Sequence, residues 1–156
     1  MAIERAREYL KRYNLEDEIM EFVVSSATVK EAAEALNCEE GKIAKTLSFI
    51  VEDKPILIVA AGDVKVDNGK YKSEFQVKAK MIPFECVEEK IGHAVGGVCP
   101  FGVNDDVKIY LDNSLKRFEI VYPACGSSNS AIKLTTEKLE KIINYERWID
   151  VCKIVE

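Results

Sequence analysis

The stretch KTLSFIVEDKPILIVAAGD, which spans residues 45–63, decides the fold class. Two runs rich in Ile, Val and Leu flank a turn at Glu52–Pro55, and this arrangement predicts two strands joined as a hairpin. The second run, Ile56–Ala61, is apolar at nearly every position, as a strand buried on both faces would be. The stretch therefore predicts a sheet that contains a fully covered strand.

Helix and strand signals alternate irregularly on both sides of this hairpin. Apolar residues spaced by three and four predict a helix over 3–13, and Thr28 with Glu31 forms a capping box for a second helix. Further helices are expected at 39–44, 83–92 and 135–145, and further strands at 107–112, 118–125, 130–134 and 147–154. The segment VDNGKY, residues 66–71, is turn-like, and a helix with Tyr71 and Phe75 spaced by four is expected to follow. The order predicts a single compact α+β domain, residues 1–156, around a mixed or largely antiparallel sheet.

The bulk composition is that of an ordinary globular domain. The 156 residues carry a net charge of −5, with 47% hydrophobic and 31% charged residues. No apolar run approaches the roughly 20 residues that span a membrane. Met1 leads directly into charged, helix-like sequence, which is not the pattern of a signal peptide. We therefore expect a cytoplasmic protein with no membrane partner.

The cysteines and the single histidine do not indicate a metal centre. The five cysteines are scattered and no two form a C-x-x-C pair: Cys38, Cys86, Cys99, Cys125 and Cys152. This spacing favours neither a disulfide framework nor a structural zinc site. Glycine-rich nucleotide motifs and a Walker loop are also missing. We expect no metal and no cofactor.

One loop concentrates unusual backbone chemistry. The segment GHAVGGVCPFGV, residues 92–103, holds four of the eight glycines, one proline and the only histidine. Glycine permits a close approach to the main chain, and proline fixes φ. The segment is therefore either a tight structural loop or a pocket wall whose peptide N–H groups face a ligand. A nucleophilic pair of Cys99 with His93 is a third interpretation.

A basic segment lies within this acidic chain. KVDNGKYKSEFQVKAK, residues 65–80, carries five lysines against Asp67 and Glu74. Such a patch can hold a few phosphates, although a solvated lysine-rich turn and helix would have the same composition.

Several blocks taken together resemble one known family. GKIAKTLSFI, LIVAAGD, GHAVGGVCPFG, IYLDNSL and ACGSSNSAIKLT occur in this order between Ser26 and Ile143 and resemble the YbaK/EbsC family of prolyl-tRNA-synthetase-associated editing domains. The resemblance implies a compact α+β domain with a mixed, partly barrel-like sheet flanked by helices. It also implies a trans-acting aminoacyl-tRNA deacylase that hydrolyses the ester of mischarged tRNA, with prolyl-tRNA synthetase as a possible partner.

The same resemblance implies candidate site residues. Lys45, in its K-T-L context, would anchor a phosphate or ribose oxygen of the terminal adenosine and orient the ester. The G-x-x-x-P element would offer peptide N–H groups to the substrate carbonyl, and its residues are Gly96, Gly97, Val98, Cys99 and Pro100. His93 and Phe101 would line the pocket rather than catalyse. The attacking group would be water or the 2′-hydroxyl of the tRNA; in the cysteine-editing branch the substrate thiol is implicated.

The last block departs from the cysteine-editing pattern G-x-R-G-L-D. Ala131 stands about where that pattern has its acidic residue. Gly126, Ser128, Asn129 and Ser130 could instead contact a small amino acid or its amine through hydrogen bonds. The expected substrates are therefore alanine, serine, threonine or cysteine on tRNA, with tRNA-Pro as the first candidate.

The basic segment supplies the expected tRNA contacts, which are Lys70, Lys72, Lys78 and Lys80. Two other function classes stay open at this point. The first is a non-catalytic module that binds tRNA or a synthetase, and the second is a thiol-based enzyme centred on Cys99.

Overall fold

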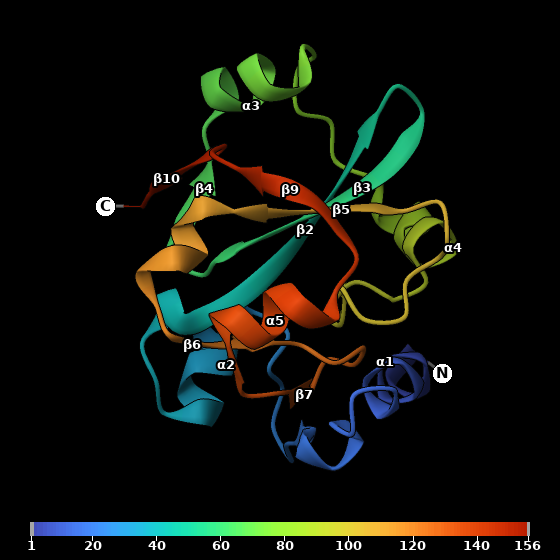
Figure 1. Cartoon of the computed structure of the whole chain (residues 1–156), viewed down its shortest axis with the longest axis vertical. Coiled ribbons are helices and arrows are strands. Elements are labelled where there is room, and N and C mark those ends of the chain that lie inside the picture. Colours follow the sequence, from blue (N-terminus) through green and yellow to red (C-terminus); the bar gives the residue numbers. More distant parts are fainter. Residues whose placement is uncertain (1, 156) are drawn as a thin grey trace.

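The computed structural model describes residues 2–155, and Figure 1 shows its elements in chain order. The helices within this range are α1 (Ala2–Lys11), α2 (Val29–Leu36), α3 (Asn68–Phe75), α4 (Val87–Ile91) and α5 (Thr136–Ile142). The strands are β1 (Met20–Glu21), β2 (Ile43–Val51), β3 (Lys54–Ala61), β4 (Val64–Val66), β5 (Lys108–Asp112), β6 (Ile120–Pro123), β7 (Ser130–Ala131), β8 (Leu134–Thr135), β9 (Tyr145–Ile149) and β10 (Cys152–Ile154). None of the helices in this range is both long and apolar enough to cross a bilayer.

The predicted hairpin forms the centre of the molecule. β2 and β3 pair antiparallel from Ala44 with Ala61 to Val51 with Lys54. Glu52 and Asp53, the two residues of the turn, have φ of 51° and 64°. A two-residue turn with positive φ at both positions matches the right-handed twist of the strands that it joins.

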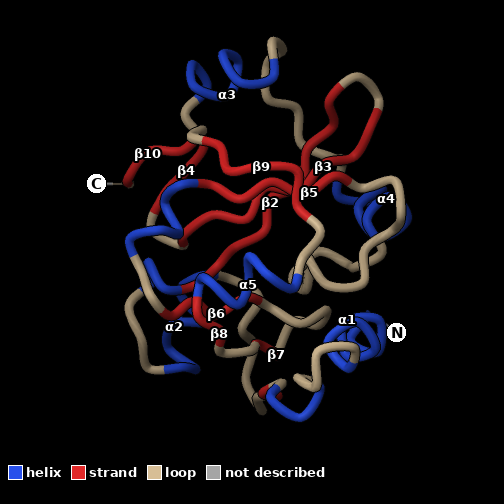
Figure 2. Tube along the Cα trace, in the orientation of Figure 1, coloured by secondary structure: helices blue, strands red, loops and turns tan. Residues whose placement is uncertain are grey.

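Around the hairpin, six strands form a mixed sheet in the order β8-β6-β2-β3-β5-β9. The pairs β2–β6, β3–β5 and β5–β9 are parallel, and β2–β3 and β6–β8 are antiparallel. The sheet curves into a half-barrel with helices around it, as Figures 1 and 2 show. The predicted α+β class with a mixed, partly barrel-like sheet is confirmed.

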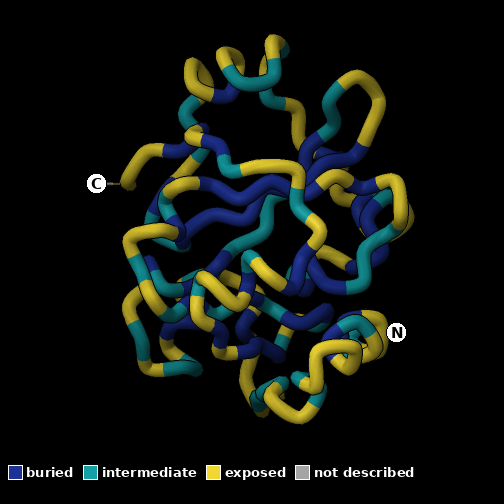
Figure 3. Tube along the Cα trace, viewed as in Figure 1, coloured by how far each residue is buried: buried dark blue, intermediate teal, exposed yellow. Residues whose placement is uncertain are grey.

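Both faces of β3 are buried, as its apolar sequence predicts. Leu57, Val59 and Ala61 belong to the larger core, which includes apolar residues of α1, α4 and α5. Ile56, Ile58 and Ala60 belong to a second core with Tyr71 of α3. Successive side chains of a strand point to opposite faces, so one strand supplies both cores. The continuous dark path of buried residues through the middle of Figure 3 follows this arrangement.

Local signals located the start of α2 and the end of α4 correctly. The Thr28 hydroxyl accepts a hydrogen bond from the Glu31 N–H at 3.1 Å and caps α2. That hydroxyl also donates to the Glu31 carboxylate, where a standard capping box would use the Thr28 N–H. Gly92 ends α4 with φ of 107°, as expected for a glycine C-cap.

Several expected elements differ in the structure. The helix expected over 135–145 ends at Ile142, and Tyr145 already begins β9. The strand expected over 130–134 is divided between β7 and β8, which pair with β1 and β6. The segment 39–44 forms only a 3₁₀ turn over Glu40–Lys42, because Ile43 and Ala44 pair with β6. The expected strand over 147–154 is divided between β9 and β10, which belong to different sheets. Asp112 accepts a hydrogen bond from the Val151 N–H at 3.0 Å and holds the chain where it leaves one sheet for the other.

Candidate functional site

The outer edge of β2 is only partly paired. β6 pairs with Ile43 and Ala44 at one end, and at the other end Met81 forms a bridge with Phe49. Ser48 O and Ile50 N take part in that bridge, and the backbone groups of every second strand residue point to the same edge. The N–H and C=O of Thr46 therefore face a gap. Within residues 2–155, neither β6 nor the segment around Met81 extends far enough to pair with them.

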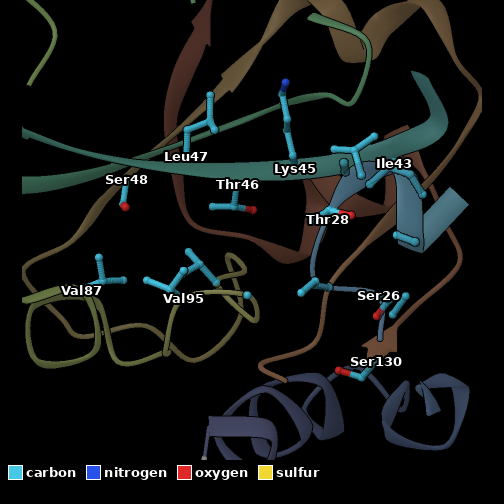
Figure 4. A pocket seen from close by; sticks show the side chains of 18 of the residues that line it. Ser26, Thr28, Ile43, Lys45, Thr46, Leu47, Ser48, Val87, Val95 and Ser130 are labelled. Carbon is cyan, nitrogen blue, oxygen red and sulfur yellow. The ribbon is translucent and has the colours of Figure 1, made fainter. Parts of the chain in front are cut away.

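A cavity of about 420 Å³ opens at this gap. Its lining residues come from the segments 26–32, 43–48, 81–87 and 95–98, with Tyr122, Ala124, Ser130 and Ala131 completing the wall. Figure 4 shows Thr46 and Ser48 on the face of β2 that looks toward Val87 and Val95. The open strand edge and the predicted glycine loop thus line one cavity.

The lining is largely apolar, and hydroxyl groups supply most of its polar side chains. Ser26, Thr28, Thr46, Ser48 and Ser130 all belong to it. The Thr46 hydroxyl oxygen is buried and has no hydrogen-bond partner within the described chain. An unpaired buried hydroxyl costs free energy, so this group is available for a ligand.

Among the described residues that line the cavity, Lys45 is the charged one. Its side chain extends along the face of β2 opposite to Thr46. Its ammonium donates a hydrogen bond to the carbonyl of Val64. Burial lowers the pKa of Lys45, and the nearby Cys152 and Asp63 oppose that shift. The predicted anchoring lysine therefore lies at the open edge, with its charge on the far side from Thr46.

The glycine loop is held against the turn that follows Cys125. Gly96 has φ of 95°, a conformation that favours glycine. A Cβ on Gly97 would lie 2.6 Å from Gly126 C and from Ser127 N, so glycine is required there by close backbone approach. The Gly97 N–H donates to Ala94 O at 3.0 Å and is already engaged. Among the five G-x-x-x-P residues, Gly96 and Val98 line the cavity.

His93, Cys99 and Phe101 lie in the core and do not line the cavity; each is 0% exposed. His93 Nε2 lies 2.6 Å from Phe101 O and 3.5 Å from Cys99 Sγ. Burial lowers the pKa of His93 and raises the pKa of Cys99 to about 12. The pair is thus in contact, but both groups are held neutral and away from solvent. Pro100 borders a separate surface cavity beside α1.

Cys99 should resist alkylation in the native protein. The thiolate is the reactive form, and a pKa near 12 leaves very little of it at neutral pH. With iodoacetamide and peptide mass spectrometry, we expect Cys99 to be labelled more than about 100-fold more slowly than the half-buried Cys86. In urea both should be labelled. Equal rates in the native protein would reopen the thiol-enzyme interpretation.

The turn 126–130 is tied to the segment that enters α2. Ser128 O accepts from the Ser26 N–H at 2.7 Å, and Asn129 Nδ2 donates to Phe22 O at 2.9 Å. The Ser127 hydroxyl donates to Ser130 Oγ at 2.6 Å. Ser130 lines the cavity, whereas Gly126, Ser128 and Asn129 do not belong to its lining.

The four lysines expected to bind tRNA differ in their surroundings. Lys70 forms an ion pair with Asp150 at 3.1 Å and also donates to Cys152 O. It therefore fastens α3 to the β9–β10 turn. Lys72, Lys78 and Lys80 are exposed and belong to no ion pair found among residues 2–155.

Sequence reasoning missed several lining residues, namely Thr46, Ser48, Ser26 and Thr28. For two of them a signal was present. Residues 44, 46, 48 and 50 share one face of the strand, and polar residues at 46 and 48 interrupt an otherwise apolar face. A polar side chain on the core face of a strand needs a hydrogen-bond partner, and a ligand or water must supply one where the protein does not.

The half-barrel sheet and its edge cavity define a small α+β domain of the YbaK editing fold. Residues 24–142 match the family model described as aminoacyl-tRNA editing domain, and the chain belongs to this family. It is 50% identical to the uncharacterized protein YwhH of Bacillus subtilis, over 98% of both chains.

More distant relatives extend the comparison. The chain is 27% identical, over 80% of its length, to a proline–tRNA ligase of Lactiplantibacillus plantarum, and covers 22% of that ligase. A crystal structure of a proposed trans-editing enzyme for prolyl tRNA synthetase superposes with a TM-score of 0.86 at 28% identity, over 97% of both chains.

Proposed function

We propose that this protein is a trans-acting deacylase, which hydrolyses the ester of tRNA mischarged with a small uncharged amino acid. The candidate amino acids are alanine, serine, threonine and cysteine, and tRNA-Pro is the first candidate tRNA. The observation that carries the proposal is the neutral, hydroxyl-bearing cavity at an open strand edge, with Lys45 beside it. The family assignment supports the reaction class.

The cavity lining supports selection by size and charge. A charged substrate side chain would be buried there without a partner, which is costly. Small uncharged groups meet apolar walls and the free Thr46 hydroxyl. Synthetase pockets separate small amino acids by only about 1–3 kcal/mol, so a second hydrolytic site restores accuracy.

The chemistry requires no protein nucleophile. Water, or the 2′-hydroxyl of the terminal ribose followed by water, attacks the ester carbonyl; the bond to the ribose oxygen breaks, and that oxygen takes up a proton. The products are a free amino acid and uncharged tRNA. Lys45, whose ammonium lies on the opposite face of β2 from the glycine loop, anchors a phosphate or ribose oxygen of the terminal adenosine and so orients the ester. The backbone N–H groups of Gly96 and Val98 are the candidate donors to the carbonyl oxygen.

The similarity to a segment of a proline–tRNA ligase supports prolyl-tRNA synthetase as the source of the mischarged tRNA. A separate chain of this kind would take the product after its release, in the cytoplasm where tRNA is charged.

The proposal is tested by deacylation time courses on tRNA-Pro charged separately with alanine, serine, threonine, cysteine and proline. We expect one or two of the first four to be released faster than in buffer, with proline spared. Release of all five at the buffer rate, together with measurable tRNA binding, would identify a non-catalytic binding module instead.

Thr46→Val should change substrate preference without harming the fold. Valine keeps the shape of threonine and removes an unpaired buried hydroxyl, so thermal stability should be unchanged or slightly higher. A hydrogen bond to a substrate hydroxyl contributes about 0.5–1.5 kcal/mol, so kcat/KM for a seryl ester should fall roughly 3- to 10-fold. The alanyl ester is the control and should be unaffected. An equal loss on both esters would exclude this role.

A further inference from the structure

The first helix, α1, packs against the glycine loop, residues 92–103, and Figure 1 shows it beside the segment that follows α4. Ala6 and Leu10 are both 0% exposed and belong to the same core as Phe101 of the loop. The ring centroids of Tyr9 and Phe101 lie 6.0 Å apart. The reaction proposed above gives α1 no part, although it contacts a loop that lines the cavity.

Arg5 of α1 contacts both ends of the glycine loop. Its Nη1 donates a hydrogen bond to Gly92 O at 3.3 Å, and its Nη2 donates to Asn104 Oδ1 at 3.0 Å. The Asn104 N–H donates to Ile91 O at 2.8 Å, which brings the two ends of the loop together. The guanidinium is planar and carries several donors in a fixed geometry. One side chain from outside the loop therefore joins its entry to its exit.

Two of the four glycines in the loop make room for Arg5. A Cβ on Gly102 would lie 2.5 Å from Arg5 O, and the φ of Gly102 is 70°. A Cβ on Gly92 would overlap the Arg5 guanidinium. The other two, Gly96 and Gly97, lie in the middle of the loop, where Gly96 lines the cavity. Contact with α1 thus accounts for the glycines at the ends of the loop.

We propose that Arg5 is a positioning residue for the middle of the glycine loop; this inference rests on the proposed function. Gly96 and Val98 line the cavity and are the candidate donors to the ester carbonyl. A loop whose ends are held together has fewer conformations open to its middle. Residues 24–142 match the family model, so that match assigns no role to α1.

The exposure of Arg5 separates this role from a contribution to global stability. Its side chain lies at the surface, where a substitution usually changes the free energy of unfolding little. The same hydrogen bonds act directly on the ends of the loop. A small displacement of a positioned group can still lower the rate of a reaction strongly. Loss of Arg5 should therefore affect turnover far more than stability.

Steady-state deacylation by Arg5→Ala is the first test. We expect kcat to fall at least about tenfold while KM stays within about twofold, because the loop acts on the carbonyl rather than on the tRNA as a whole. Arg5→Lys keeps one donor and should recover part of the loss. Arg12→Ala is the matched control on the same helix, since the Arg12 guanidinium lies over the Tyr9 ring at 5.3 Å. A wild-type kcat in folded Arg5→Ala, or an equal loss in Arg12→Ala, would overturn the proposal.

Amide hydrogen exchange tests the same claim without substrate. In Arg5→Ala, exchange should be at least about tenfold faster both at Asn104, beside the lost contact, and at Gly97 in the middle of the loop. Arg12→Ala should exchange as the wild type does at both positions. Faster exchange at Asn104 alone would limit Arg5 to the end of the loop and overturn the proposal. Should Arg5→Ala fail to fold, Arg5→Gln replaces it with the same expected results.

The two proposals fail in different ways. Faster exchange at Gly97 in Arg5→Ala, without deacylation of any ester by the wild type, would leave the hold of Arg5 on the loop standing and remove the proposed enzymatic function. Deacylation by the wild type that Arg5→Ala leaves unchanged, with unchanged exchange at Gly97, would leave the function standing and remove the positioning role.

Discussion

Replacement of Lys45 by alanine should lower the rate of deacylation at least about 100-fold, because an ester that is no longer held in position can lose about that much rate. Among the described residues that line the cavity at the edge of β2, Lys45 is the charged one, so no other side chain there can substitute for it. The fold should survive with a modest loss of stability, because alanine removes the hydrogen bond from the Lys45 ammonium to the Val64 carbonyl. Single-turnover rates and thermal unfolding measure the two effects separately.

Two further variants show whether the charge or the side-chain stem carries the effect. Lys45→Met keeps an unbranched apolar stem without the charge and should lose as much activity as alanine. Lys45→Arg keeps the charge and should retain part of the activity. A Lys45→Ala variant that folds normally and deacylates at the wild-type rate would remove Lys45 from the mechanism.

Replacement of Gly97 by alanine should reduce both stability and activity. The new Cβ would lie 2.6 Å from two backbone atoms of the Gly126–Ser127 turn, and backbone atoms cannot move aside as a flexible side chain can. Overpacking of this kind costs about 1–3 kcal/mol. We therefore expect a lower free energy of unfolding in urea, and a large fall in kcat as Gly96 and Val98 move away from the cavity.

The control for this change is Gly69→Ala in α3. The new Cβ there would meet only the Asp67 carboxylate oxygen at 3.3 Å, and alanine favours a helix over glycine by about 1 kcal/mol. Stability should change far less, and activity should be preserved. A Gly97→Ala protein with wild-type stability and rate would show that the contact between loop and turn does not shape the site.

Local sequence signals predicted those parts of the fold that depend on neighbouring residues. The β2–β3 hairpin, the Thr28 cap and the Gly92 C-cap are of this kind. The division of 147–154 between two sheets depends on a hydrogen bond from Val151 to Asp112, which lie 39 residues apart. The sequence of residues 147–154 carries no sign of this contact, because Asp112 lies outside the segment.

The site was predictable to a smaller extent. Lys45 came from a family motif, whereas the glycine loop was indicated by its own composition as well; both contribute to the cavity lining. The core positions of His93 and Cys99 were not predictable, because a loop rich in glycine has no periodicity that assigns side chains to the interior or to solvent. Thr46 could have been found, since it interrupts the apolar alternation of β2.

The central claim is that the cavity at the edge of β2 receives a small amino acid whose ester the protein cleaves. Single-turnover deacylation, with the protein in excess over tRNA-Pro charged with alanine, serine, threonine or cysteine and prolyl-tRNA-Pro as the comparison, tests it most directly. The account predicts that at least one of the four non-cognate esters is released at least about tenfold faster than in buffer, a gain of about 1.4 kcal/mol, with prolyl-tRNA-Pro at the buffer rate. Decay of all five at the buffer rate, with the tRNA bound, would contradict it.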